Sequence, residues 1–423
     1  MDSEPVRTGA GPVGAATPDA AIGTDPRWVR RTAQFLTGQT ISLFGSSLVQ
    51  YAILWHLTLE TQSGRVLTAT MVFGFLPQAV VSVFAGVWAD RHSRKLLIIG
   101  ADLAIASTTL LLAAAFLSGA GELWMILAAM AVRSAGAGIH TPAVGALLPQ
   151  IVPTDHLMRV NGINTSIQSS MMLLSPAVAA WLYATFGLTA VLLVDVVTAV
   201  LGVTLLALLA VPRLVRSGEP VGYMTDLRAG LDYVRSHVLV RRIIVFYAVV
   251  FFLVVPPAQL TPLMVVRSFG AEVWKLTATE IAFSIGMIAG GIGLATWGGL
   301  RDRIAMLTWS SVVLGALSVG LGLSSTLWVF LGFMLLTGLT VPAFSTTSHT
   351  LLQETVEPEV QGRVFGLLGI VIALAMPAGM AVFGPLADVV SVESLLVIGG
   401  VLTVLTGVAI RLGAPRVREA PIG

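Results

Sequence analysis

The sequence contains no cysteine, and few of its 423 residues carry a charge. Without cysteine the chain cannot form disulfides, and cysteine thiolates are excluded as nucleophiles and as metal ligands. Charged residues make up 11% of the chain, whereas a soluble domain usually carries about 25%. Lysine is almost missing, and neither Lys95 nor Lys275 stands in the Gly-Lys-Ser/Thr of a phosphate-binding loop. Without an ATPase site, any pumping must use an ion gradient or a separate subunit.

Sets of catalytic and metal-binding residues are missing as well. The six histidines show no short metal-ligand spacing, and no nucleophile stands in a recognisable set with a base. We expect no metal site, no cofactor and no enzymatic function.

Hydrophobic residues make up 56% of the chain, and most of them fall in long runs. A hydrocarbon core about 30 Å thick needs roughly 20 apolar residues per spanning helix. Twelve runs meet this requirement, so we expect an all-α membrane protein with twelve transmembrane helices. The runs cover residues 32–58, 66–89, 96–117, 122–149, 160–186, 188–211, 242–267, 278–299, 305–325, 326–351, 362–386 and 392–411.

The basic residues predict how these spans are oriented. If the spans alternate from a cytoplasmic N-terminus, twenty of the 24 Lys and Arg residues face the cytoplasm. The exceptions are Arg133, which falls inside a span, and Arg65, Arg267 and Lys275, which face outside. Cytoplasmic loops of membrane proteins carry such an excess of positive charge. The bias predicts that both termini are cytoplasmic, and it supports an even number of spans.

The longest polar segment between the spans, residues 212–241, divides the chain into two units of six spans. We expect these units to be the domains, residues 28–211 and 242–413. Within the segment, apolar residues recur at helical spacing, which predicts an amphipathic helix on the cytoplasmic membrane surface. These apolar residues are Met224, Leu227, Leu231, Val234 and Val238.

Both ends of the chain lack an apolar run. Residues 1–27 are rich in Gly, Ala and Pro, which is typical of disorder, and we expect a cytoplasmic tail. The acidic start and the missing hydrophobic core argue against a signal peptide. Residues 414–423 are expected to form a second short cytoplasmic tail.

Matching motifs occur in the two units. Gly86–Arg91 follows the second span, and Gly298–Arg303 follows the eighth. Arg159–Gly162 opens the fifth span, and Arg363–Gly366 opens the eleventh. Both pairs are separated by nearly the same number of residues, which indicates duplicated halves. Parallel repeats around a central cleft are typical of secondary transporters, with the substrate bound near the membrane midplane.

The first motif identifies a family. Residues Gly86–Lys95 match the pattern G-x-x-x-D-R-x-x-R-K, and the chain therefore resembles the major facilitator superfamily over about residues 28–413. The second copy departs from the pattern after Arg303. The resemblance implies two pseudo-symmetric six-helix bundles. Within the superfamily, Gly38–Ser46 and Gly362–Gly366 are similar to the macrolide-efflux branch of drug:proton antiporters.

The motif residues are candidates for a cytoplasmic gate. Asp90 is an anion near helix starts, whose dipoles attract negative charge, so we expect it to pair with Arg363. By the pseudo-twofold relation, Asp302 would face Arg159. Each pair would form when the cytoplasmic side closes; the alternative is that the basic residues only fix orientation. The gating candidates are Gly86, Asp90, Arg91, Arg94, Lys95, Arg159, Gly298, Asp302, Arg303 and Arg363.

Three ionisable residues inside spans are candidates for proton coupling. Arg133 lies about 11 residues into the fourth span, where a cation should face a cavity or a carboxylate. It opens Arg133–Gly138, which approximates a family motif whose arginine assists proton coupling. Asp102 and Asp195 are candidate proton carriers. Structural roles, an ion pair for Arg133 and a packing partner for each carboxylate, are the alternatives. Ser175–Ala180 lacks the glycines of the antiporter motif at that place.

The resemblance also implies which residues contact substrate, because the first, fourth, seventh and tenth spans line the cleft in this fold. Their aromatic side chains and amides suit a bulky amphipathic molecule. The candidates are Gln39, Gln50, Tyr51, Trp55, Tyr247, Phe251, Gln259 and Met334.

These observations predict a macrolide-type or multidrug exporter in the plasma (inner) membrane of a bacterium. We expect it to exchange its small-molecule substrate for protons by alternating access, as a monomer in membrane lipid and without nucleic acid. The alternatives are an exporter of one natural product such as a siderophore, a lipid flippase, or a sensor that does not transport.

Overall fold

A computed structural model describes residues 27–211, 223–300 and 302–413 of the chain. Within these ranges the chain is helical and contains no strand, as the prediction of an all-α protein requires. The two expected terminal tails lie outside the described residues, apart from Arg27.

The helices begin and end close to the predicted runs. They are α2 Trp28–Thr61, α3 Gly64–Arg91, α4 Arg94–Leu117, α5 Leu123–Ile151, α6 Thr154–Ala207, α7 Tyr223–Ser236, α8 Val238–Leu253, η1 Pro256–Leu260, α9 Thr261–Met264, η2 Val265–Phe269, α10 Val273–Trp297, α11 Arg303–Gly322, α12 Leu327–Thr355, α13 Pro358–Leu386 and α14 Val392–Gly413, where η denotes a π-helix. Ten helical segments of the described chain are long and apolar enough to cross a membrane.

Helix α6 contains a break. It is 54 residues long, and at Gly187 the backbone leaves the helical region with φ 76° and ψ 179°. Glycine adopts such a conformation at little cost because it has no side chain. The boundary predicted between two spans falls on this residue. The seventh predicted span is irregular too, because π-turns η1 and η2 interrupt its α-helical geometry.

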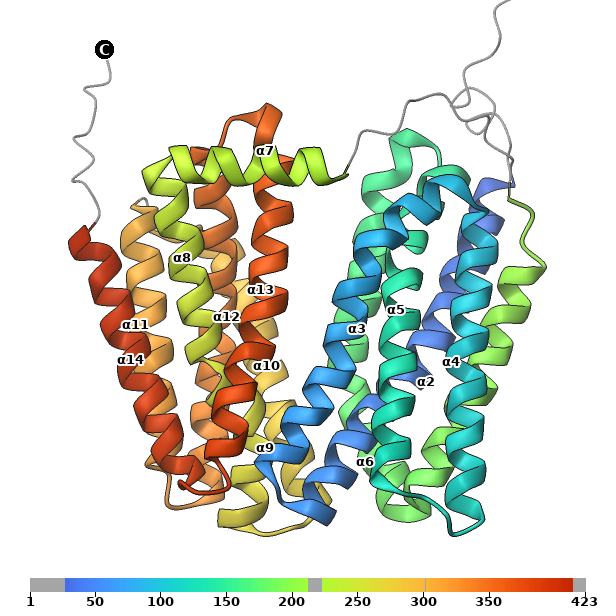
Figure 1. The fold of residues 1–423 in the computed structure, drawn as a ribbon, viewed down its shortest axis with the longest axis horizontal. Helices are drawn as coiled ribbons and strands as arrows, with labels where there is room; N and C mark the ends of the chain where they lie inside the picture. Colours follow the sequence, from blue (N-terminus) through green and yellow to red (C-terminus); the bar gives the residue numbers. More distant parts are fainter. Residues whose placement is uncertain (1–26, 212–222, 301, 414–423) are drawn as a thin grey trace, which may run out of the picture.

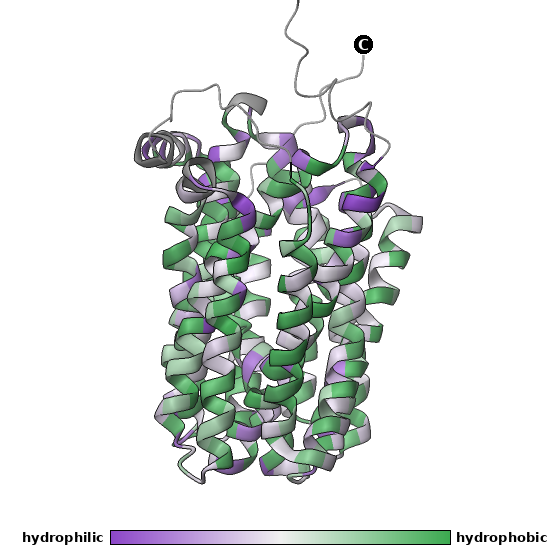
Figure 2. Ribbon diagram, turned by 90° about the vertical axis from the view of Figure 1, so that its right-hand side faces the viewer, coloured by the Kyte–Doolittle hydropathy of each residue, from purple (hydrophilic) through white to green (hydrophobic). Residues whose placement is uncertain are grey.

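The helices gather in two groups (Figure 1). In one group α2 packs along α6 and α3 along α5, and in the other α10 packs along α12 and α11 along α14. The groups touch mainly through α3 with α13 and α6 with α10. Hydrophobic residues cover the helix lengths, whereas hydrophilic ones concentrate toward the ends (Figure 2). This distribution is the one that a bilayer requires of lipid-facing helices.

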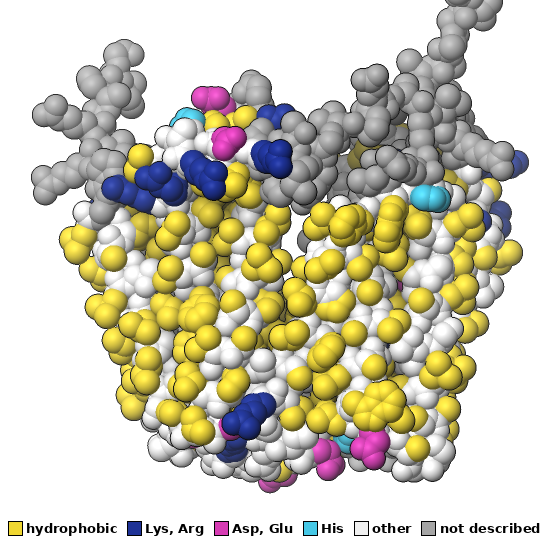
Figure 3. Space-filling model, viewed as in Figure 1, with side chains coloured by type: hydrophobic (Ala, Val, Ile, Leu, Met, Phe, Trp, Pro, Cys, Tyr) yellow, Lys and Arg dark blue, Asp and Glu magenta, His cyan; other side chains and the backbone are white. Residues whose placement is uncertain are grey.

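One edge of the molecule is hollowed between the groups. The hollow lies below the edge that carries α7 (Figure 3). A Cβ atom added at Gly162 or Gly369, on helices of the two groups, would meet nothing within 4 Å. At the opposite edge, a Cβ added at Gly64 would lie 2.0 Å from the carbonyl oxygen of Gly384. The groups are therefore in close contact at the edge of Gly64 and Gly384, and the hollow separates them near the edge of α7 (Figure 3).

Helix α7 lies where the amphipathic helix was predicted, but one face of it packs on protein. A Cβ added at its Gly230 would lie 3.1 Å from Cβ of Arg363 on α13. Val234 is buried, while Leu231 and Val238 are exposed. The side chains of Met224 and Leu227 lie outside the described residues. Helix α7 therefore covers the start of α13, an arrangement that helical periodicity alone could not reveal.

Candidate functional site

A buried ion pair joins α5 to α6. Nη1 of Arg133 donates hydrogen bonds to Oδ2 of Asp195 and to Oγ1 of Thr109. The side chain of Asp195 is 0% exposed and that of Arg133 is 13% exposed. Oγ of Ser46 donates to Oδ1 of Asp195, and Oγ1 of Thr109 donates to Oδ2, each over 3.1 Å. Both carboxylate oxygens thus have donors, as a buried charge requires.

Small residues allow this site to form. A Cβ added at Gly45 of α2 would lie 1.9 Å from Oγ1 of Thr198 and 3.0 Å from Cα of Asp195. Only glycine permits this approach of α2 to α6, which brings the neighbouring Ser46 against the carboxylate. The next crossing point uses Gly38 and Gly202, where an added Cβ at Gly202 would lie 2.9 Å from the carbonyl oxygen of Gly38.

A second titratable pair lies between α4 and α5. Nε2 of His140 is 3.4 Å from Oδ1 of Asp102, and both side chains are nearly buried. The geometry is not that of a hydrogen bond, and Nε2 of His140 finds no hydrogen-bond partner among the described residues. The pair is therefore less completely hydrogen-bonded than the Arg133–Asp195 pair.

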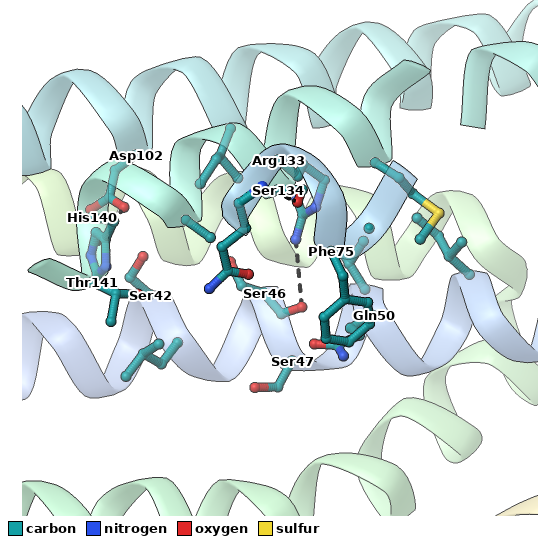
Figure 4. A pocket seen from close by; sticks show the side chains of 18 residues that line it. Ser42, Ser46, Ser47, Gln50, Phe75, Asp102, Arg133, Ser134, His140 and Thr141 are labelled. Atoms are coloured by element: carbon teal, nitrogen blue, oxygen red, sulfur yellow. Dashed lines mark hydrogen bonds and ion pairs between the residues drawn. The ribbon is translucent and has the colours of Figure 1, made fainter. Parts of the chain in front are cut away.

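Members of both pairs line one cavity of about 300 Å³. Figure 4 shows Asp102 and His140 side by side, with Phe75 and Gln50 farther along the cavity and Arg133 between them. The apolar side chains of Ile53, Ile105 and Met130 also line the cavity. The polar lining includes Ser42, Ser46, Ser47, Gln78, Ser134 and Thr141. Such a mixed lining suits a ligand with an apolar body and a few hydrogen-bonding groups.

The basic end of the first motif binds carbonyl groups of its own helix group. Nζ of Lys95 donates to the carbonyl oxygens of Ala207 and Leu209, over 2.7 and 2.8 Å, at the C-terminus of α6. Nη1 of Arg94 donates to the carbonyl oxygen of Ala146 over 2.7 Å. A cation at a helix C-terminus is favourable because of the helix dipole.

The second motif is likewise tied to the last helix of its group. Gly298 and Gly299, with φ 79° and 73°, turn the chain out of α10. Asp302 then caps α11 by accepting from the amide of Ala305 over 2.9 Å, and it pairs with Nη1 of Arg411 on α14 at 2.6 Å. The hydrogen bond from the amide of Ala305, followed by the one from Arg411, holds the pKa of Asp302 below its usual value. Nε of Arg303 lies 3.4 Å from Oε1 of Glu354.

The predicted pairs, Asp90 with Arg363 and Asp302 with Arg159, would form when the edge that carries α7 is closed. In this structure the two groups are separated by a hollow near that edge (Figure 3). Asp302 binds Arg411, and the exposed Arg159 is not its partner in this structure. The surroundings of Gly86 and the side chains of Asp90 and Arg91 lie outside what the structure describes, so the pair of Asp90 with Arg363 stays a prediction.

The eight predicted substrate contacts lie in different surroundings. Gln50 lines the cavity, and Tyr51, Phe251 and Gln259 are partly exposed. The other four, Gln39, Trp55, Tyr247 and Met334, are buried in helix packing. Nε1 of Trp55 and the hydroxyl of Tyr247 have no hydrogen-bond partner among the described residues. In this structure these four therefore belong to the core, because the helices that carry them are packed together.

Sequence reasoning missed several residues of the site. Ser46 and Thr109 hold the Asp195 carboxylate, and His140 faces Asp102, although its place in the sequence gives no sign of this contact. Serine and threonine are frequent in spans, so spacing does not single them out. Asp388, in the turn after α13, also went unnoticed because a single carboxylate outside a span has no distinctive pattern.

Comparisons with known proteins agree with this arrangement. Residues 35–376 and 274–422 match the Major Facilitator Superfamily. Macrolide efflux protein A of Streptococcus pyogenes is 34% identical over 382 residues, which cover 89% of this chain and 94% of the relative. The protein of that name from Enterococcus faecalis is 34% identical over 323 residues, 75% of this chain and 99% of the relative.

Solved structures share the fold at lower identity. A bacterial homologue of the iron transporter ferroportin, in its inward-facing state, has a TM-score of 0.68 and 17% identity, and the match covers 91% of this chain and 98% of that one. A nucleoside transporter has a TM-score of 0.69 and 13% identity, with 90% and 98% covered.

Proposed function

Because the chain belongs to the major facilitator superfamily, we propose that it exports bulky amphipathic molecules of the macrolide type from a bacterial cell. Membership makes the chain a multi-pass membrane transporter and not an enzyme. The substrate class rests on one observation, the 34% identity to Macrolide efflux protein A over 89% of this chain. The cavity that contains Gln50, Phe75 and His140 supports it, because its lining is partly apolar and partly hydrogen-bonding.

The proposal includes the architecture predicted from the sequence: twelve spans in two pseudo-symmetric six-helix bundles. With α2 counted and α6 divided at Gly187, the ten apolar segments become twelve. The domains would be residues 28–211 and 242–413, and both termini would be cytoplasmic. Arg and Lys side chains along the edge of α7 (Figure 3) support a cytoplasmic position for that edge.

Alternating access is the mechanism that this arrangement supports. With α7 in the cytoplasm, the hollow opens inward and the tight contact between Gly64 and Gly384 lies outside. Substrate would enter from the cytoplasm through the hollow. It would leave after the cytoplasmic edge closes and the outer contact opens. The same fold in an inward-facing relative agrees with this assignment.

For proton coupling we propose the Arg133–Asp195 pair, with Asp102 as a second proton site. Protonation of Asp195 would remove one charge of the pair and release Arg133. Arg133 and Asp102 both line the cavity. Protonation of Asp195, which releases Arg133, or of Asp102 would therefore change the charge next to a bound substrate. A transported molecule and a proton can then influence one another without direct contact.

The test is macrolide accumulation in an efflux-deficient bacterial host, with and without the gene. We expect macrolide accumulation to be lower when the protein is present. A protonophore should raise the accumulation back to the level of cells without the gene. Unchanged accumulation of every macrolide, with the protein present in the membrane at normal amounts, would reject the proposal. Reduced accumulation of a siderophore alone would favour the dedicated natural-product exporter, and lipid redistribution alone would favour the flippase.

A further inference from the structure

One carboxylate joins the two helix groups at the edge opposite α7. Asp388, in the turn between α13 and α14, accepts from the amides of Gly64 and Arg65 over 2.6 and 3.1 Å. It also accepts from Oγ of Ser63 over 3.1 Å. These three donors form the N-terminus of α3, which belongs to the other group. An anion is favourable there because unpaired amides and the helix dipole point at it.

An arginine completes the same junction. Nη2 of Arg267, in η2, lies 3.3 Å from Oδ1 of Asp388. The guanidinium also donates to the carbonyl oxygens of Ala387 and Gln62. Gln62 is the C-cap of α2, so the cation of one group sits at a helix C-terminus of the other. The anion and the cation therefore match the two dipole ends that meet at the α2–α3 turn.

The backbones below this turn approach closely. Oγ1 of Thr68 donates to the carbonyl oxygen of Met380 over 3.0 Å. A Cβ added at Gly384 would lie 1.8 Å from Oγ1 of Thr68. Small residues thus let α3 and α13 meet without intervening side chains, and the seam formed by Gly64, Thr68 and Gly384 is tight.

We propose that Asp388 and Arg267 are the latch that closes the outer end of the transport path, by capping the facing ends of α3 and α2. The role in transport rests on the function proposed above, whereas the closure itself does not. The latch can release because both side chains are partly exposed, so water can replace their hydrogen bonds as the edge opens. Arg267 lies in a π-turn, a widened helical geometry that often marks functional sites.

Compared with the pair predicted for the cytoplasmic side, the two halves exchange roles: here the second half supplies the carboxylate and the first half supplies the capped helix. There, Asp90 of the first half was expected at the start of the eleventh span. Here Asp388 of the second half lies at the start of α3. The same chemistry, a carboxylate that caps a helix of the opposite half, would then hold each end of the path in turn.

The test measures how often the outer seam opens. In the purified full-length protein, the thiol of a Thr68→Cys variant reports opening, because it lies in the seam and the natural chain has no cysteine. We expect Asp388→Asn to raise its rate of labelling by a maleimide at least tenfold, a shift of about 1.4 kcal/mol. Arg267→Gln should raise the rate in the same direction.

Two controls separate latch release from general loosening. Glu393→Gln removes a carboxylate at the same edge that binds Ser268 within one group, so it should leave the rate unchanged. The thiol of Ser318→Cys, buried between α11 and α14 where Ser318 binds Leu396, should label slowly in every variant. An unchanged rate at Thr68→Cys, or an equal rise at Ser318→Cys, would overturn the latch. Because no substrate is present, a failure of macrolide export would leave this result intact.

Discussion

Arg133 and Asp195 form a buried ion pair in the first helix group. Its carboxylate is fully buried and accepts hydrogen bonds from Ser46 and Thr109 as well as from the guanidinium. Such a pair has two explanations, structural support or proton exchange. The two explanations differ in what happens when both charges are removed together.

Removal of one charge should destabilise the protein. Asp195→Asn leaves the guanidinium of Arg133 buried without its anion, which costs about 3–5 kcal/mol. Replacing both, by Arg133→Met with Asp195→Leu, should restore a near-normal melting temperature because no charge remains buried. We expect the double variant to bind macrolide but to lose proton-driven efflux. Normal efflux by the double variant would make the pair purely structural.

The outer carboxylate should not titrate near neutral pH. Burial alone would raise the pKa of Asp388, but the hydrogen bonds from Gly64, Arg65, Ser63 and Arg267 outweigh it, and the pKa lies below its ordinary value of 3.8. A lowered pKa stabilises the closed edge at all pH values above about 4, and that stability is lost as the pH falls through the lowered pKa. Among the residues that the structure describes, Arg65 and Arg267 form ion pairs with this carboxylate.

Spin labels on Ser118→Cys and Ser325→Cys, both exposed in turns at this edge, can measure the effect. Their separation should stay constant between about pH 5 and pH 8 and lengthen only in stronger acid. A change between pH 5 and 8 that Asp388→Asn abolishes would show that this carboxylate is itself a physiological proton site.

At the scale of helices, hydrophobic run length predicted most of the structure. The predicted break between residues 186 and 188 falls on Gly187, where φ is 76°, because glycine between two apolar runs is a local signal. The π-turns η1 and η2 were not predicted, since they depend on how the seventh span packs against its neighbours. The contact of Arg133 with Asp195 escaped prediction for a related reason: the pairing of spans far apart in sequence leaves no local pattern.

Packing of α10 on α12 gives a test with a matched neighbour. A Cβ added at Gly290 would lie 2.2 Å from the carbonyl oxygen of Leu339, whereas one added at Gly291 would meet nothing within 4 Å. Gly290→Ala should therefore separate the helices and destabilise the protein by about 1–3 kcal/mol. Gly291→Ala should be neutral or slightly stabilising, because alanine favours helix more than glycine does. Equal melting temperatures in detergent would contradict this close approach.

For the whole molecule, orientation in the membrane decides which edge is the cytoplasmic one. Ser93 and Ser118 cap the two ends of α4 and are both exposed. In intact cells, an impermeant thiol reagent should label Ser118→Cys and spare Ser93→Cys, because α7 and its arginines share the edge of Ser93. Permeabilised cells should label both variants. The reverse pattern in intact cells would invert the topology and exchange the inner and outer edges.

If both latches exist, their losses should oppose each other. Asp90→Asn should favour the inward-open state, and Asp388→Asn should favour the outward-open state. A coupling of about 1–3 kcal/mol corresponds to a shift of roughly five- to 150-fold in the ratio of the two states. Because the sites lie at opposite edges, the two effects should add, and the double variant should return toward the natural ratio.

Two spin-label pairs measure this ratio: the outer pair at Ser118 and Ser325, and a cytoplasmic pair at Ser93 and Ser236, all exposed. Asp388→Asn should lengthen the outer separation and shorten the cytoplasmic one, and Asp90→Asn should lengthen the cytoplasmic one. The double variant should also regain part of the transport rate that each single variant loses, since neither state is then over-stabilised. A shift in the same direction for both single variants would show that the two edges do not compete, and the reciprocal latch mechanism would have to be abandoned.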